Sequence, residues 1–137
     1  MLSKSRIIGI DYGTKRVGVA VSDESGVFAL PFGILDNKGD LPLVVGYIVA
    51  IAKEKAADTV VMGESRDYSG KPNAVLAASL ELKRALETKG LRVILEPEFM
   101  TSHQAERTRH ELGGVLGKND ASAAAIILQS FLDKQAR

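Results

Sequence analysis

The sequence predicts an α/β fold, in which a mixed five-stranded sheet carries helices on both faces. Three strand-like segments come first, and helical segments then alternate with two further strands. Short turns join the first three strands, which favours antiparallel hairpins. The later strands are separated by helices, which favours parallel pairing. Sheets that combine these two connections are usually covered by helices on both sides.

Five short apolar segments have the composition of β-strands, and they cover residues 6–11, 17–22, 27–34, 59–62 and 91–95. The first two are joined by a short glycine-containing loop and should form a hairpin. Pro31 interrupts the third segment. Because proline has no N–H to give to a neighbouring strand, we expect this segment at an edge of the sheet.

The helical segments have recognisable starts and ends. Asp40 is the expected N-cap of a first helix with Pro42 in its first turn, and Gly90 is the expected stop of a second. Apolar residues repeat at three- and four-residue steps in both helices, which predicts one buried face on each. The sequence also predicts a polar helix over 102–112, a flexible loop over 113–119 and a final helix over 120–134.

The composition is that of an ordinary globular protein and bounds the function. The chain has 137 residues, of which 45% are apolar and 26% charged, so we expect one domain over residues 1–137. Lys plus Arg is 18 and Asp plus Glu is 17, so any nucleic-acid binding must come from a local patch. The absence of cysteine excludes disulfides, thiolate metal sites and cysteine nucleophiles. Neither a secretory signal nor a long apolar span is apparent, so a cytoplasmic location is expected.

Asp11 is the most informative residue of the chain. It follows a short apolar strand, where its carboxylate should emerge from the core into solvent. Burying an unpaired carboxylate is costly, so an acid at this place needs a partner. Strands 4 and 5 end in the same way, with Glu64 and Glu98. If strands 1, 4 and 5 are parallel and adjacent, the three acids share one edge of the sheet.

The final helix supplies a fourth carboxylate. Asp120 lies at helical spacing from Ala124, Ile127 and Phe131, so it shares the face that packs on the sheet. An N-cap or dipole partner is the alternative interpretation of Asp120. Several acids packed together repel one another, and a hard divalent cation relieves the repulsion. Carboxylate ligands favour Mg²⁺ or Mn²⁺, and two such metals can drive phosphodiester cleavage.

Three cations lie where they could contact a phosphate. Lys15 and Arg16 follow Asp11 in the hairpin loop, and Lys71 lies in the polar loop of residues 65–72 near the expected edge. The alternative interpretation of Lys15 and Arg16 is a solvated hairpin tip. The loop around Lys71 lacks the full P-loop pattern.

The run Asp-Tyr-Gly-Thr-Lys-Arg-Val-Gly-Val-Ala-Val-Ser-Asp at residues 11–23 resembles the opening motif of the RuvC-like YqgF family. Its members are described as Holliday junction resolvases and as pre-16S ribosomal RNA nucleases. The resemblance continues at residues 60–63, 100–102 and 120–129, and so covers nearly the whole chain. It implies a ribonuclease H-like domain over residues 1–137. It also implies a Mg²⁺- or Mn²⁺-dependent endonuclease that cleaves structured nucleic acid, above all at the 5′ end of pre-16S rRNA in ribosome biogenesis.

Two departures from the family pattern concern the glutamates. The family usually has Asp-Glu-Arg where this chain has Pro97-Glu98-Phe99, and Gly-Leu-Pro where it has Gly63-Glu64-Ser65. Ribonuclease H-like nucleases commonly place an acid at the position of Glu64. We therefore hypothesise that catalysis and metal binding depend on Asp11, Glu64 and Asp120, with Glu98 supporting or sharing the site.

Three other functions fit the same residues. The chain could be a Holliday junction resolvase in DNA recombination and repair, or a non-catalytic module that binds nucleic acid in ribosomal particles. The run from Asp11 to Thr14 also resembles the phosphate-binding turn of actin-like ATPases, although those enzymes need two such domains. The expected partners are precursor rRNA or branched DNA and ribosomal particles, for a chain that acts as a monomer or a homodimer.

Overall fold

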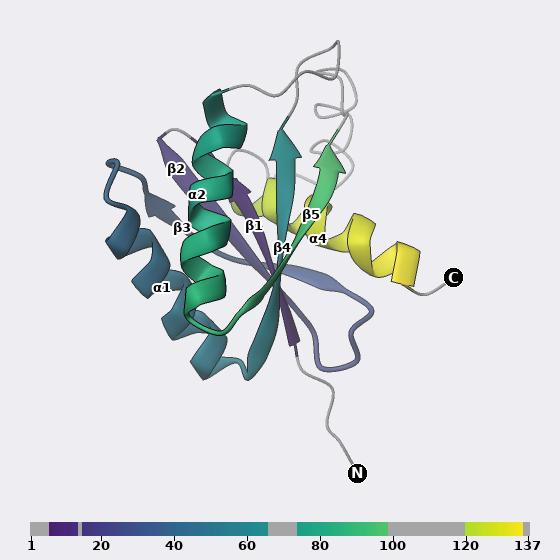
Figure 1. Ribbon diagram of the computed structural model, residues 1–137. Helices are drawn as coiled ribbons and strands as arrows, with labels where there is room; N and C mark the ends of the chain where they lie inside the picture. The colour runs from purple at the N-terminus through teal and green to yellow at the C-terminus, as the bar shows by residue number, and fades with distance from the viewer. Residues whose placement is uncertain (1–5, 14, 66–73, 99–119, 136–137) are drawn as a thin grey trace.

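The computed structural model describes residues 6–13, 15–65, 74–98 and 120–135. At positions 64, 65, 74–76, 98 and 120 it describes the backbone alone. The elements, labelled as in Figure 1, are β1 (Arg6–Tyr12), β2 (Arg16–Ser22), β3 (Ala29–Asp36), α1 (Leu41–Glu54), β4 (Ala57–Ser65), α2 (Ala74–Thr88), β5 (Arg92–Glu98) and α4 (Asp120–Gln135). The expected helix over 102–112 and the loops over 66–72 and 113–119 lie outside the described residues.

The five strands form one mixed sheet in the order β3-β2-β1-β4-β5. Strand β2 pairs antiparallel with both β1 and β3, whereas β4 pairs parallel with both β1 and β5. Helices α1 and α2 cover one face of the sheet and α4 covers the other (Figure 1). The predicted α/β class, the hairpin and the adjacent parallel strands 1, 4 and 5 are therefore confirmed.

Two strands are longer than the sequence predicted, and this moves both glutamates. Strand β4 continues to Ser65 and β5 continues to Glu98, because the two strands pair with each other beyond their apolar cores. Gly63 lies opposite Glu96, and Ser65 lies opposite Glu98. Glu64 and Glu98 were expected to follow their strands. They are instead inside them, so strand alternation fixes their positions.

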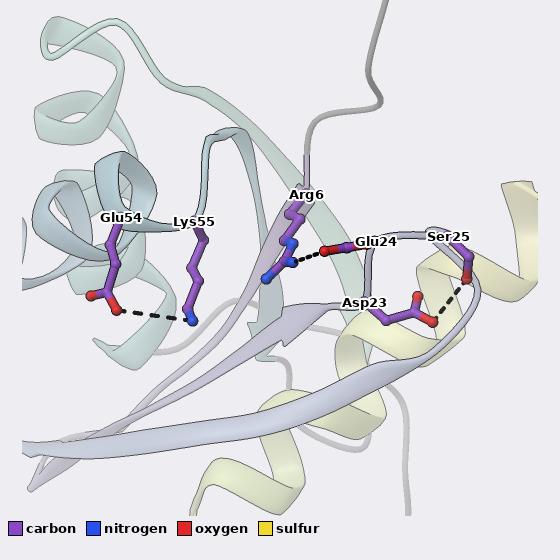
Figure 2. A network of polar contacts seen from close by, with 6 residues as sticks. All are labelled: Arg6, Asp23, Glu24, Ser25, Glu54 and Lys55. Atoms are coloured by element: carbon purple, nitrogen blue, oxygen red, sulfur yellow. Dashed lines mark hydrogen bonds and ion pairs between the residues drawn. The ribbon is translucent and has the colours of Figure 1, made fainter.

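The third strand begins later than expected, at Ala29 instead of residue 27. The carboxylate of Asp23 accepts hydrogen bonds from the N–H groups of Val27, at 3.0 Å, and Phe28, at 3.1 Å, and so holds both residues in the turn. The hydroxyl of Ser25 donates to the same carboxylate (Figure 2). These bonds to Phe28, Ser25 and Val27 lower the pKa of Asp23 below its usual value.

The alternation of β1 and β4 divides the core into two parts. Ile8 and Ile10 of β1 are fully buried beneath α1 and α2, as are Val60 and Met62 of β4. Val61 lies on the opposite face, where it packs with buried residues of α4. Alternate residues of a strand therefore point to opposite faces of the sheet, and the face decides which helices cover them.

The predicted helix signals of α1 and α2 are confirmed. The carboxylate of Asp40 accepts a hydrogen bond of 3.2 Å from the N–H of Leu43 and caps α1, and Pro42 lies in the first turn. Gly90 follows α2 with a φ of +90°, a conformation that glycine adopts at no steric cost. Buried residues at helical spacing face the sheet in each helix: Val44, Ile48 and Ile51 in α1, and Ser79, Leu82 and Leu86 in α2. None of the described helices is long and apolar enough to cross a membrane.

Strand β3 lies at an edge of the sheet, as Pro31 predicted. Its pairing with β2 is irregular, because Val19 pairs with Gly33 and Ala20 with Pro31, which leaves Phe32 as an extra residue between them. Helix α4 reaches this edge with one side chain. The amide of Gln129 accepts from the N–H of Ala29 and donates to the carbonyl of Val27, each at 2.9 Å.

Helix α4 packs directly on the backbone of β1. A Cβ atom at Gly9 would lie 2.6 Å from the Cβ of Leu128 and 2.9 Å from the carbonyl oxygen of Ala124. Both distances are shorter than van der Waals contact, and the carbonyl belongs to a helix backbone that cannot move alone. Glycine at position 9 is therefore required for α4 to approach the sheet this closely.

We expect Gly9→Ala to lower the free energy of unfolding by about 1–3 kcal/mol, since the added methyl overpacks the β1–α4 contact. Chemical denaturation measures the loss. Gly46→Ala is the matched control: a Cβ there meets nothing within 4 Å, and α1 gains a better helix former. Equal stability of the two variants would show that the close approach at Gly9 is unimportant.

Candidate active site

The carboxyl ends of β1, β4 and β5 lie at the same edge of the sheet, because the three strands are parallel and adjacent. We call this edge the rim. Asp11 lies there at the end of β1, half-buried and paired in register with Gly18 of β2. Glu64 and Glu98 lie at the ends of β4 and β5 on the same rim.

Strand alternation separates the two glutamate positions. By alternation, position 98 falls on the same face of the sheet as Ile94 and Glu96, which is the face that α4 covers. Position 64 instead falls on the same face as Val60 and Met62, which lie beneath α1 and α2. Asp11 falls on the same face of β1 as Gly9, which lies against α4. The backbone therefore brings the positions of Asp11 and Glu98 to one face and that of Glu64 to the other.

Helix α4 begins close to the same corner. Asp120 is its first residue and lies one turn before Ala124, whose carbonyl is next to Gly9. Asp11 follows Gly9 by two residues, and the first turns of α4 lie by the end of β1 (Figure 1). The contact at Gly9 therefore sets where the start of α4 lies relative to Asp11.

The acids of this corner suit a hard divalent cation. The positions of Asp11, Glu98 and Asp120 offer carboxylate oxygen only, which is the ligand chemistry of Mg²⁺ and Mn²⁺. Among the residues whose side chains are described, no three His, Cys, Asp or Glu lie close enough together to hold a metal. Those residues include Asp11, whereas the structure gives only the backbone of Glu98, Asp120 and Glu64.

The cations of the hairpin lie beside Asp11. Lys15 and Arg16 are both exposed at the start of β2. The N–H of Gly13 donates to the carbonyl of Arg16 at 2.9 Å, and a Cβ at Gly13 would lie 2.8 Å from that oxygen. This tight turn places two positive side chains within a few residues of the rim. Lys71, the third expected cation, lies outside the described residues.

A buried acid next to the rim was not expected from the sequence. Glu96 is 5% exposed, although it is charged, and its carboxylate accepts a hydrogen bond of 3.1 Å from Ser130 and forms an ion pair with Lys134. Both partners belong to α4, so Glu96 ties the second half of that helix to β5. The alternation of residues 94, 96 and 98 would have indicated it, had the expected strand not ended at residue 95.

The fold agrees with that of solved resolvases. The structure of RuvC from Thermus thermophilus superposes with a TM-score of 0.62 at 14% identity, over 96% of each chain. A Holliday junction resolvase of fowlpox virus gives a TM-score of 0.61 at 13% identity, over 94% of this chain and 99% of the other. At such identities the likeness establishes the fold alone, and that fold is ribonuclease H-like.

The family follows from the sequence comparisons. The family described as "RuvX: Holliday junction resolvase" matches residues 5–134. A protein of Chlamydia muridarum named "Putative pre-16S rRNA nuclease" is 33% identical, over 98% of this chain and 96% of its own. A protein of Acetivibrio thermocellus with the same name is 30% identical, over 96% and 98%. The chain belongs to the RuvX family, which is the YqgF family that the motif at residues 11–23 resembles.

We expect Lys134→Ala to lower the free energy of unfolding by about 1–3 kcal/mol, because Glu96 stays buried and loses its ionic partner. Urea denaturation at neutral pH measures this loss. Lys83→Ala is the control, since Lys83 pairs with Glu87 on the exposed surface of α2 at 3.0 Å. Its removal should cost no more than about 0.5 kcal/mol. Equal losses would mean that the ion pair of Glu96 does not secure α4.

Proposed function

We propose that the chain is a divalent-metal-dependent endonuclease that cleaves phosphodiester bonds at the 5′ end of precursor 16S rRNA. The observation that supports this proposal is the backbone arrangement at the rim, where positions 11 and 98 share the face that α4 covers and position 120 begins α4. The relatives named "Putative pre-16S rRNA nuclease" support both a nuclease and a role in rRNA processing. A role in rRNA processing also agrees with the cytoplasmic location expected from the sequence.

The chain's own residues divide the work of cleavage. Asp11, Glu98 and Asp120 would hold Mg²⁺ or Mn²⁺ through their carboxylate oxygens. A metal held there would supply the positive charge that activates a water and stabilises the transition state of phosphodiester cleavage. Lys15 and Arg16 would contact the phosphates beside the scissile bond and fix the strand in place. With this division of roles, no histidine base would be needed.

We infer that Glu98 is the principal glutamate of the site, and that Glu64 has at most a supporting role. The register supports this choice, because position 98 shares the α4 face with Asp11, whereas position 64 falls on the face of Met62, which α1 and α2 cover. This inference reverses the ranking that the Gly63-Glu64-Ser65 sequence suggested. It also agrees with the family pattern, in which the glutamate of the Asp-Glu-Arg segment corresponds to Glu98.

A second candidate function is cleavage of Holliday junctions, which the family description favours. The same carboxylates and metal would serve both reactions, so the substrate must be decided by experiment. Cleavage of both nucleic acids should therefore be measured side by side. A non-catalytic assembly module would bind precursor RNA without cutting it.

We expect Asp11→Asn to reduce cleavage of a precursor 16S rRNA fragment by about 100-fold or more, because loss of a metal ligand removes several kcal/mol of transition-state stabilisation. Asp120→Asn should have a similar effect. The measurement is single-turnover cleavage in Mg²⁺ and Mn²⁺, with a four-way DNA junction as the second substrate. Glu81→Gln, which neutralises an exposed acid of α2, should cut like the wild type. Equal rates for all four proteins would refute the proposed site.

The two glutamates can be separated by the same assay. We expect Glu98→Gln to slow cleavage by about 10- to 100-fold or more and to weaken metal binding, since it removes a ligand charge. Glu64→Gln should change the rate by less than about threefold, because position 64 faces the other side of the sheet. Calorimetric titration with Mn²⁺ provides the second measurement. A loss confined to Glu64→Gln would reverse the assignment.

A further inference from the structure

The loop between β3 and α1 is bonded to the hairpin tip that carries Lys15 and Arg16. The N–H of Asn37 donates to the carbonyl of Lys15 at 2.7 Å. The side-chain amide of Asn37 donates to the carbonyl of Gly13 at 2.8 Å. Two segments that are more than twenty residues apart in the chain are thus joined at the end of β1, beside Asp11.

Asn37 is itself held by a third bond. Its side-chain oxygen accepts from the N–H of Gly39 at 3.1 Å, and Gly39 has a φ of +78°. The side chain is half-buried and fixed at both ends, so its geometry is set before any ligand binds. Asn37 therefore acts as a clamp between the hairpin tip and the start of α1.

The clamp places a third cation beside the first two. Lys38 follows Asn37 directly and is exposed, like Lys15 and Arg16. Because Arg16 pairs with Asp36 and the N–H of Asn37 is bonded to the carbonyl of Lys15, Lys38 follows directly after the residue that is bonded to Lys15. The three cations come from two segments, which is why no run of positive charge marks them in the sequence.

Two acids flank this surface. Asp40 uses its carboxylate to cap α1 at the N–H of Leu43, and Asp36 lies opposite Arg16 in the strand pairing. Within the described residues, neither Lys15 nor Lys38 takes part in an ion pair. Both lysines are therefore available to an external anion.

We propose that Lys38 is a further phosphate-contacting residue, and that Asn37 is a positioning residue that holds Lys15, Arg16 and Lys38 in one surface for the nucleic-acid backbone. The inference rests on the proposed nuclease function, because it assumes that the nucleic-acid strand cleaved at the rim lies across this surface. Contacts of this kind fix the register of a nucleic acid without reading its sequence. The ligand is the sugar–phosphate backbone of the RNA substrate.

The first test is equilibrium binding of a labelled precursor 16S rRNA fragment in the Asp11→Asn background, where cleavage does not interfere. Lys38→Gln should weaken binding about 2- to 5-fold, as expected for one exposed ion pair. It should also reduce the slope of log K against log salt by about 0.7–0.9, the value for one phosphate contact. Lys38→Arg should keep the wild-type slope, because the charge remains.

Lys53→Gln is the matched control, since Lys53 is an exposed lysine at the other end of α1, about 20 Å along the helix. It removes the same charge and should leave the slope unchanged. Equal effects of Lys38→Gln and Lys53→Gln would overturn the proposal, because the loss would then reflect net charge alone.

The second test separates positioning from folding. In the otherwise wild-type enzyme, Asn37→Ala removes the bond to Gly13 and should raise KM about 2- to 10-fold, the range for one lost hydrogen bond, with kcat within twofold of the wild type. A variant that lowers the melting temperature but leaves KM unchanged would overturn the positioning role. If cleavage depends on Asp11 but Lys38→Gln binds the RNA as tightly as its parent, this inference is overturned and the proposed function stands. An RNA that the wild type neither binds nor cuts would overturn both.

Discussion

Helix α4 lies against β1 with no room for a side chain at Gly9, and this close approach governs both the fold and the rim. The backbone of Ala124 meets the backbone of β1, so the helix cannot slide along the sheet without losing the contact. Position 11 follows that contact in β1, and position 120 precedes it by one turn in α4. Where these two backbone positions lie relative to each other therefore depends on a residue that has no side chain.

One contact fixes a point on α4 but leaves its direction free, and Glu96 supplies the second point. Its carboxylate is bonded to Ser130 and Lys134, which lie six and ten residues beyond Ala124. Both partners of the buried Glu96 carboxylate lie on α4, so the bonds that compensate its burial also align that helix. Position 98, next but one in β5, then lies at a fixed place relative to the start of α4.

The sequence was sufficient for the elements whose signals are local. Asp40 and Gly90 marked helix ends through caps that need only neighbouring residues, and Pro31 marked an edge strand through its missing N–H. Strand ends were harder to predict, because β4 and β5 extend by pairing with each other and not by apolar composition. The ranking of Glu64 against Glu98 depended on those ends. The bonds of Asn37 to the hairpin could not have been found, since Gly13 and Lys15 lie over twenty residues away in the sequence.

The edge formed by β3 bears on how the protein behaves when it is crowded. Leu30 and Phe32 are exposed there at 54% and 41%, and an open apolar strand of this kind invites the growth of cross-β fibrils. The N–H of Ala29 is already occupied by Gln129, Pro31 has none, and Phe32 interrupts the regular spacing. An incoming strand therefore finds no continuous ladder of donors. The exposed apolar edge of β3 therefore offers only an interrupted backbone template to an added strand.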